Sequence, residues 1–141
     1  MKKLNKPLFS LYETTFLVIK TNLGYDQALE LFYEIVDNSL GNALNEYIFE
    51  KGNPKDFAKI MKKRDESVGN KVTFKVTNDK IIYRVHTNIM PNLRGHMSIN
   101  DYANVLVGIK IKHLLGKGWV FKISKHLWKG DKFSEYIITR E

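Results

Sequence analysis

The chain has 141 residues, the size of one ordinary domain, and 43% of them are hydrophobic, which is enough to build a buried core. It contains no cysteine, and this excludes disulfides, thiolate zinc sites, iron–sulfur clusters and cysteine nucleophiles. Its net charge is +8, but no helix-turn-helix, zinc-finger or RNA-binding motif accompanies the basic residues, so we expect a solvated basic surface and no nucleic-acid partner. An acidic partner or a membrane surface stays open as an alternative explanation of the charge.

The chain has no apolar run near the roughly 20 residues that cross a bilayer. The basic residues at its start, Lys2, Lys3 and Lys6, are not followed by the apolar stretch of a secretory signal. We therefore expect a cytoplasmic protein without a transmembrane segment. Because no linker, repeat or change of composition divides the sequence, we expect a single domain over residues 1–141.

Apolar residues recur at helical spacing through the first half of the chain and predict three helices. The first runs from Leu8 to Lys20. The second, from Tyr25 to Lys51, is the longest, and we expect it to be covered from two sides because three further apolar residues widen its stripe, Leu40, Leu44 and Ile48. Asn53 and Pro54 start a third helix, since Asn accepts amide protons at the cap and Pro suits the first helical turn.

In the second half, the apolar spacing changes from about 3.6 residues to about two. Val72 to Val76 and Ile81 to Val85 alternate around a turn at Asn78-Asp79 and predict a β-hairpin. The same alternation in Trp119 to Ser124, and again in Phe133 to Arg140, predicts a second hairpin.

One more helix is predicted between the two hairpins. An irregular segment, Thr87 to Met97, leads to Ser98-x-x-Asp101, which has the spacing of a capping box, and an apolar stripe follows as far as Leu114. The element order is therefore ααα-ββ-α-ββ. It predicts an α+β fold with a helical N-terminal half and one antiparallel sheet made of both hairpins, with helices on one face.

Motifs in both halves of the chain resemble those of one superfamily. In the N-terminal half, Leu23-Gly24-x-x-x-Ala28-Leu29-x-Leu31 and Leu40-Gly41-x-Ala43-Leu44 are similar to the paired-helix opening of the aminothiazoline carboxylate hydrolases. In the C-terminal half, Tyr102-Ala103-Asn104-x-Leu106-x-Gly108, Lys129-Gly130-Asp131 and Glu135-x-Ile137 are similar in order and spacing to TRAPP core subunits. Most of the chain thus resembles the superfamily that holds these two families and the vinyl reductase ligand-binding domains.

This resemblance implies a domain with a pocket for a hydrophobic ligand. Vinyl reductase domains and the hydrolases usually carry two cysteines around the last turn, and by spacing these fall on His126 and Ser134 here. Because neither is cysteine, we expect the zinc site of some relatives to be absent, and we expect no metal and no cofactor.

Candidate ligand-binding residues fall into two groups. His86, Arg94 and His96 bracket the irregular segment, where an imidazole beside a guanidinium could hold a carboxylate or phosphate, although a plain solvated loop is the stronger explanation of them. The aromatic residues Tyr102, Trp119 and Trp128 could line an apolar cavity or simply fill a core. We assign no catalytic residue, because the chain lacks a Gly-x-Ser-x-Gly elbow and a His-x-x-x-His pair.

The leading functional hypothesis is a non-enzymatic module that binds a small hydrophobic molecule or acyl chain and forms a homodimer. The first helix and the edge of the second would form the dimer interface, with Phe9 and Leu11 pointing outward beside Leu40 and Leu44. One alternative is a hydrolase resembling the aminothiazoline carboxylate hydrolases, in which Arg94 grips the carboxylate and a histidine activates water. Another is a TRAPP-like scaffold subunit with a protein partner.

Overall fold

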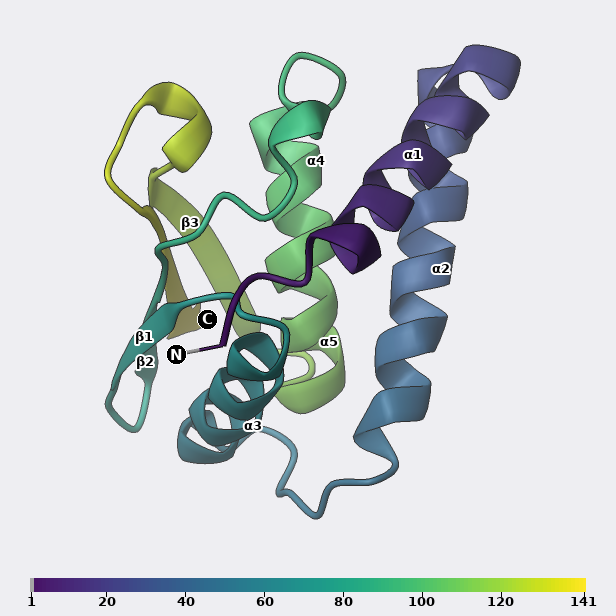
Figure 1. The fold of residues 1–141 in the computed structure, drawn as a ribbon. Coiled ribbons are helices and arrows are strands. Elements are labelled where there is room, and N and C mark those ends of the chain that lie inside the picture. The colour runs from purple at the N-terminus through teal and green to yellow at the C-terminus, as the bar shows by residue number, and fades with distance from the viewer. Residues whose placement is uncertain (1) are drawn as a thin grey trace.

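The computed structural model describes residues 2–141 (Figure 1). Its N-terminal part is a hairpin of two helices, α1 (Lys6–Leu23) and α2 (Tyr25–Leu44). The Asn5 side chain caps α1 by accepting a hydrogen bond from the Leu8 amide. Gly24 joins the helices at a φ of 86°, a left-handed conformation that glycine adopts without strain, so the chain reverses in one residue.

Helix α2 ends at Leu44, so the predicted extension to Lys51 is wrong. Tyr47 and Phe49 pack partly against the core, whereas the intervening Ile48 is fully exposed. This inside–outside alternation belongs to an extended chain and happens to resemble the continuation of a helical stripe. A turn directly after Leu44 lets the chain change direction toward α3 (Pro54–Ser67). The side chain of Asn53 caps α3 by accepting hydrogen bonds from the Lys55 and Asp56 amides, as predicted.

Both predicted hairpins are confirmed and join in one antiparallel sheet of order β1-β2-β4-β3. The strands are β1 (Val72–Val76), β2 (Lys80–Val85), β3 (Trp119–Lys125) and β4 (Ser134–Arg140). The register pairs Phe74 with Tyr83, Tyr83 with Tyr136, and Tyr136 with Ile123. A row of large apolar side chains therefore crosses the inner face of the sheet.

The predicted helix between the hairpins is also present, and we call it the central helix. It consists of α4 (Ile99–Ala103), a π-helical turn (Asn104–Gly108) and α5 (Ile109–Leu114). Ser98 caps it by accepting a hydrogen bond from the Asp101 amide. Short 3-10 turns occur at Pro91–Leu93 before it and at Leu127–Lys129 between β3 and β4. The α+β class and the predicted element order are thus confirmed.

The elements form layers (Figure 1). The central helix and α3 lie against the inner face of the sheet, and the α1–α2 hairpin covers the central helix on the side away from the sheet. Within residues 2–141, no helix is long and apolar enough to cross a membrane.

Burial revises the residues expected at a dimer interface. Phe9, expected to point outward, is buried within the chain, and so are Leu40 and Leu44. The physical reason is that α1 and the central helix cover the wide apolar stripe of α2 from its two sides. Of the four expected residues only Leu11 is exposed, with 65% of its surface accessible.

Candidate ligand-binding cavity

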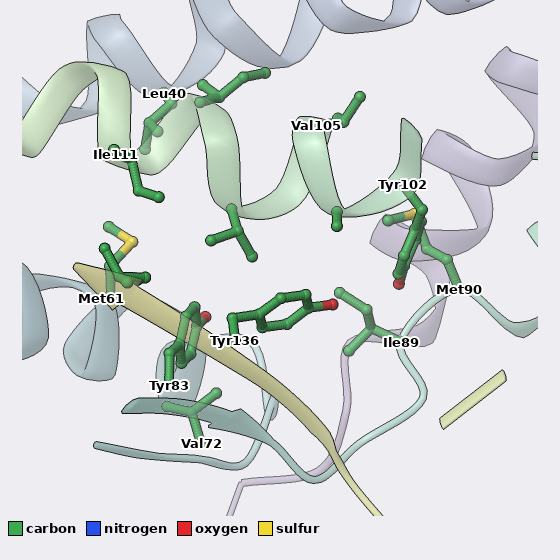
Figure 2. Packing of buried hydrophobic residues seen from close by; sticks show 14 of the residues in the cluster. Leu40, Met61, Val72, Tyr83, Ile89, Met90, Tyr102, Val105, Ile111 and Tyr136 are labelled. Carbon is green, nitrogen blue, oxygen red and sulfur yellow. The ribbon is translucent and has the colours of Figure 1, made fainter. Parts of the chain in front are cut away.

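A cavity of about 220 Å³ lies between the α1–α2 hairpin, α3 and the central helix. We call it the apolar cavity, because most of its wall is aliphatic or aromatic, including Phe9, Tyr12, Phe32, Leu40, Met61 and Val105. Leu40, Val105 and Met61 appear in Figure 2 on the elements that bound this space. Val105 and Leu106 come from the π-helical turn, a local widening that is frequent at functional sites.

Polar contacts hold the α1–α2 hairpin against the rest of the chain around this cavity. The Glu13 carboxylate accepts hydrogen bonds from the Asn92 amide at 2.6 Å and from its side-chain nitrogen at 3.2 Å. The Tyr25 hydroxyl donates to Asp101 at 2.5 Å. Near the other end of α2, Asp37 lies 2.6 Å from His113 Nε2. These bonds tie the α1–α2 hairpin to the 3-10 turn at Pro91–Leu93 and to the central helix.

A buried polar cluster borders the apolar cavity. The Tyr83 hydroxyl donates a hydrogen bond to Asp65, and Lys110 Nζ lies 2.9 Å from the Tyr83 oxygen and 3.4 Å from Asp65 Oδ1. Burial, followed by the charge of Asp65, raises the pKa of Tyr83 well above its usual value, so the hydroxyl keeps its proton. Arg64 lines the same cavity. The cluster compensates the charges of Asp65 and Lys110 within itself.

A second, smaller space of about 20 Å³ lies between the central helix, the sheet and the 3-10 turn that follows β3. We call it the polar chamber, because most of the residues in its wall have side chains with polar atoms, among them Asn70, Tyr102, His126, Trp128 and Tyr136. In Figure 2 the hydroxyl end of Tyr136 extends toward Ile89 and Tyr102 beneath the central helix. The chamber has room for about one water-sized group.

Two atoms of the chamber wall, His126 Nε2 and Asn70 Oδ1, are buried and have no hydrogen-bond partner among the described residues. His126 Nδ1 accepts a hydrogen bond from the Trp128 amide at 3.0 Å, which assigns the imidazole proton to Nε2. Burial, reinforced by the charge of Lys129, lowers the pKa of His126 to about 4, so the ring is neutral near pH 7. The chamber therefore offers one free donor and one free acceptor.

The structure brings together only part of the predicted ligand-binding set. Tyr102 and Trp128 both line the polar chamber, with ring centroids 4.2 Å apart. His86 instead lies 3.0 Å from Thr73 and packs against Phe133, outside both spaces.

The remaining predicted residues lie elsewhere on the molecule. Arg94 and His96 are exposed, and His96 Nδ1 lies 3.4 Å from Lys20 Nζ. Trp119 is buried beneath the Arg140 guanidinium, which lies 4.8 Å from its ring centre. None of these three residues lines the apolar cavity or the polar chamber. In residues 2–141 no group of three or more His, Asp or Glu side chains converges in a way that could hold a metal ion.

Sequence reasoning missed Asp65, Asn70, Tyr83 and Lys110 as site residues. A signal was present for two of them. Asp65 follows Met61 by four residues on the apolar stripe of α3, and Lys110 follows Tyr102 and Leu106 at the same spacing. A charged side chain on a core-facing stripe needs a buried partner, and each supplies one for the other.

Comparisons with known proteins concern the fold alone. No protein-family model matches the chain, and no curated protein matches its sequence. Among solved structures, it is similar to the crystal structure of an H-NOX protein from S. oneidensis in the Fe(II)NO ligation state. The TM-score is 0.54 at 13% identity, and the match covers 95% of this chain and 74% of that one. The iron and nitric oxide named there are properties of that protein.

Proposed function

We propose that this protein binds a small hydrophobic molecule or an acyl chain in the apolar cavity and does not catalyse a reaction on it. The observation that carries the proposal is the cavity itself, about 220 Å³ of space with mostly aromatic and aliphatic walls, which opens to the surface of the domain. Ligand pockets are concave and mostly apolar with a few polar groups, and this cavity has such a lining.

The surroundings of the cavity support binding over chemistry. The hydrolase alternative needs Arg94 and a base, His86 or His96, beside one substrate, and none of these residues lines the cavity. Asp65 and Lys110, the charged pair at its edge, already bond to each other and to Tyr83. No specific observation favours a trafficking-scaffold role.

Membership of the vinyl reductase and TRAPP superfamily is part of the same proposal. What supports it is the order of the elements together with the Tyr102-to-Gly108 motif, which contains the whole π-helical turn beside both spaces. A cytoplasmic location is also proposed, and the absence of cysteine supports it.

Homodimer formation completes the proposal. Leu11 and Val18 lie seven residues apart on one face of α1 and are 65% and 53% exposed. Apolar side chains on the outer helical layer are suited to a two-fold contact between copies of the chain.

The binding proposal is tested by filling the cavity. Val36 lines it and is partly buried, so Val36→Trp should occupy the space and lower the affinity for an uncharged fluorescent apolar probe at least about tenfold while the helical circular dichroism is retained. Val120→Trp, on an exposed position of β3, is the matched control and should bind as the unmodified protein does. Equal affinity of all three proteins, or no binding by the unmodified protein, would overturn the proposal.

A further inference from the structure

The polar chamber contains two unused hydrogen-bonding atoms of opposite character. His126 is 1% exposed and lines this chamber, and no acceptor among the described residues lies within hydrogen-bond distance of its protonated Nε2. Asn70 is 2% exposed, and its Oδ1 finds no donor there. A buried polar atom without a partner costs free energy, so a native protein normally supplies one, from the chain or from a bound molecule.

Neither side chain is free to turn away to solvent. His126 is held by the hydrogen bond from the Trp128 amide to Nδ1, and its ring packs edge-on against Tyr102 and Trp128. The backbone of Asn70 is anchored by a hydrogen bond from its amide to the Asp65 carbonyl at 2.9 Å. The imidazole is therefore fixed in the wall of the chamber, and Asn70 is buried in the same wall.

The chamber adjoins the apolar cavity. Four residues line both spaces, Asn70, Ile89, Leu106 and Lys110. A molecule whose apolar body occupies the apolar cavity can therefore place its polar end at this shared wall. That end would lie beside Asn70 and the polar chamber. The other two side chains of the shared wall, Ile89 and Leu106, are aliphatic.

The charges around the chamber favour an uncharged end group. His126 is neutral, so it contributes a donor without positive charge. Lys110 is already bonded to Asp65 and Tyr83, and it cannot fully compensate a further anion without giving up those contacts. An ionised carboxylate in this space would lack a dedicated cation, and an unpaired buried charge is costly. A hydroxyl group is neutral, accepts one hydrogen bond and donates another.

We infer that the ligand of the apolar cavity is an alcohol, whose hydroxyl group enters the polar chamber, accepts a hydrogen bond from His126 Nε2 and donates one to Asn70 Oδ1. This inference rests on the proposed function and specifies the class of its ligand. A hydroxyl matches the chamber in size as well as in chemistry, since the space holds about one water-sized group.

Three probes with the same chain length separate the possibilities: decanol, decanoate and decane. Each displaces a fluorescent apolar probe from the purified protein. We expect decanol to bind about tenfold more tightly than either of the others, because only decanol satisfies both free atoms without burying a charge. His126→Phe keeps an aromatic ring but removes the donor, and it should lower the decanol affinity about tenfold while leaving decane unchanged. His96→Phe, which changes an exposed histidine outside both spaces, is the matched control and should change neither.

A measurement on the unmodified protein guards against a variant that fails to fold. The nuclear magnetic resonance signal of the His126 Nε2 proton should shift when decanol is added and stay in place with decane. If decane binds but decanol binds no more tightly, the chamber holds only a water molecule and the inference is overturned while the proposed function stands. If decanoate binds most tightly, the inference is likewise overturned in favour of an anion site. If none of the three binds, the proposed function falls together with the inference.

Discussion

His126 couples the stability of the protein to pH. Its pKa in the folded protein is lowered to about 4 from an ordinary value of 6.5, because burial disfavours the charged ring. Between these two values the unfolded chain binds a proton that the folded chain does not bind. The contribution of the neutral His126 ring to the free energy of unfolding is therefore fully present above pH 6.5 and is lost as the pH falls toward 4.

Urea denaturation at several pH values measures this effect. From pH 7 to pH 4 the free energy of unfolding of the unmodified protein should fall by up to about 3 kcal/mol more than that of His126→Phe, which has no group to titrate at this position. Parallel pH dependence of the two proteins would contradict the assignment of a buried neutral imidazole.

Asp65 and Lys110 form a mostly buried ion pair, in which each charge compensates the other. Lys110→Met should lower the free energy of unfolding by about 2 kcal/mol, because Asp65 then remains buried with Tyr83 as its only side-chain partner. The double variant Asp65→Leu/Lys110→Met removes both charges and should be more stable than Lys110→Met alone. Additive losses in this double-mutant cycle would show that the pair is not coupled.

At the scale of elements, helix starts are decided locally. The Asn53 side chain bonds to two amides in the first turn of α3, at 2.9 Å to Lys55 and 3.2 Å to Asp56. Asn53→Ala should lower the free energy of unfolding by about 1 kcal/mol, measured by thermal or urea denaturation, whereas Asn53→Asp keeps an acceptor and should lose little. Equal losses for the two variants would show that the cap bonds contribute no stability.

Helix ends in this protein depend on more distant contacts. Helix α2 stops at Leu44 although apolar residues continue, because Tyr47 and Phe49 pack against the core and α3 begins in a new direction at Pro54. The pattern that follows Leu44 suits a helix and an extended segment equally well. Only the position of α3 distinguishes the two.

At the scale of the whole molecule, the proposed dimer contact through α1 can be tested with one exposed and one buried leucine. Sedimentation at micromolar concentration should show a dimer for the unmodified protein and a folded monomer for Leu11→Glu, since Leu11 is mostly exposed in one chain and a charge at a buried contact is costly. Leu44→Glu is the contrasting variant and should unfold, because Leu44 is buried within the chain. A monomeric unmodified protein, or a dimeric Leu11→Glu, would contradict the proposed interface.

The sequence by itself determined the order of helices and hairpins, the inner faces of the strands and the caps at Asn53 and Ser98. These features depend on spacings and hydrogen bonds between residues close in the chain, so a local pattern records them. Tyr102 was named in the same way, as an aromatic residue on the apolar stripe of the central helix, whereas Trp128 was named for its aromatic side chain alone.

The tertiary structure alone decided the site. Asp65 meets Lys110 across 45 positions of sequence, and Asn70 and His126 line one chamber although they lie on opposite sides of the central helix in the chain. The apolar cavity likewise lies between elements that are distant in the chain, the α1–α2 hairpin, α3 and the central helix. No local pattern records which distant side chains will share a wall, because that depends on how the layers pack against one another.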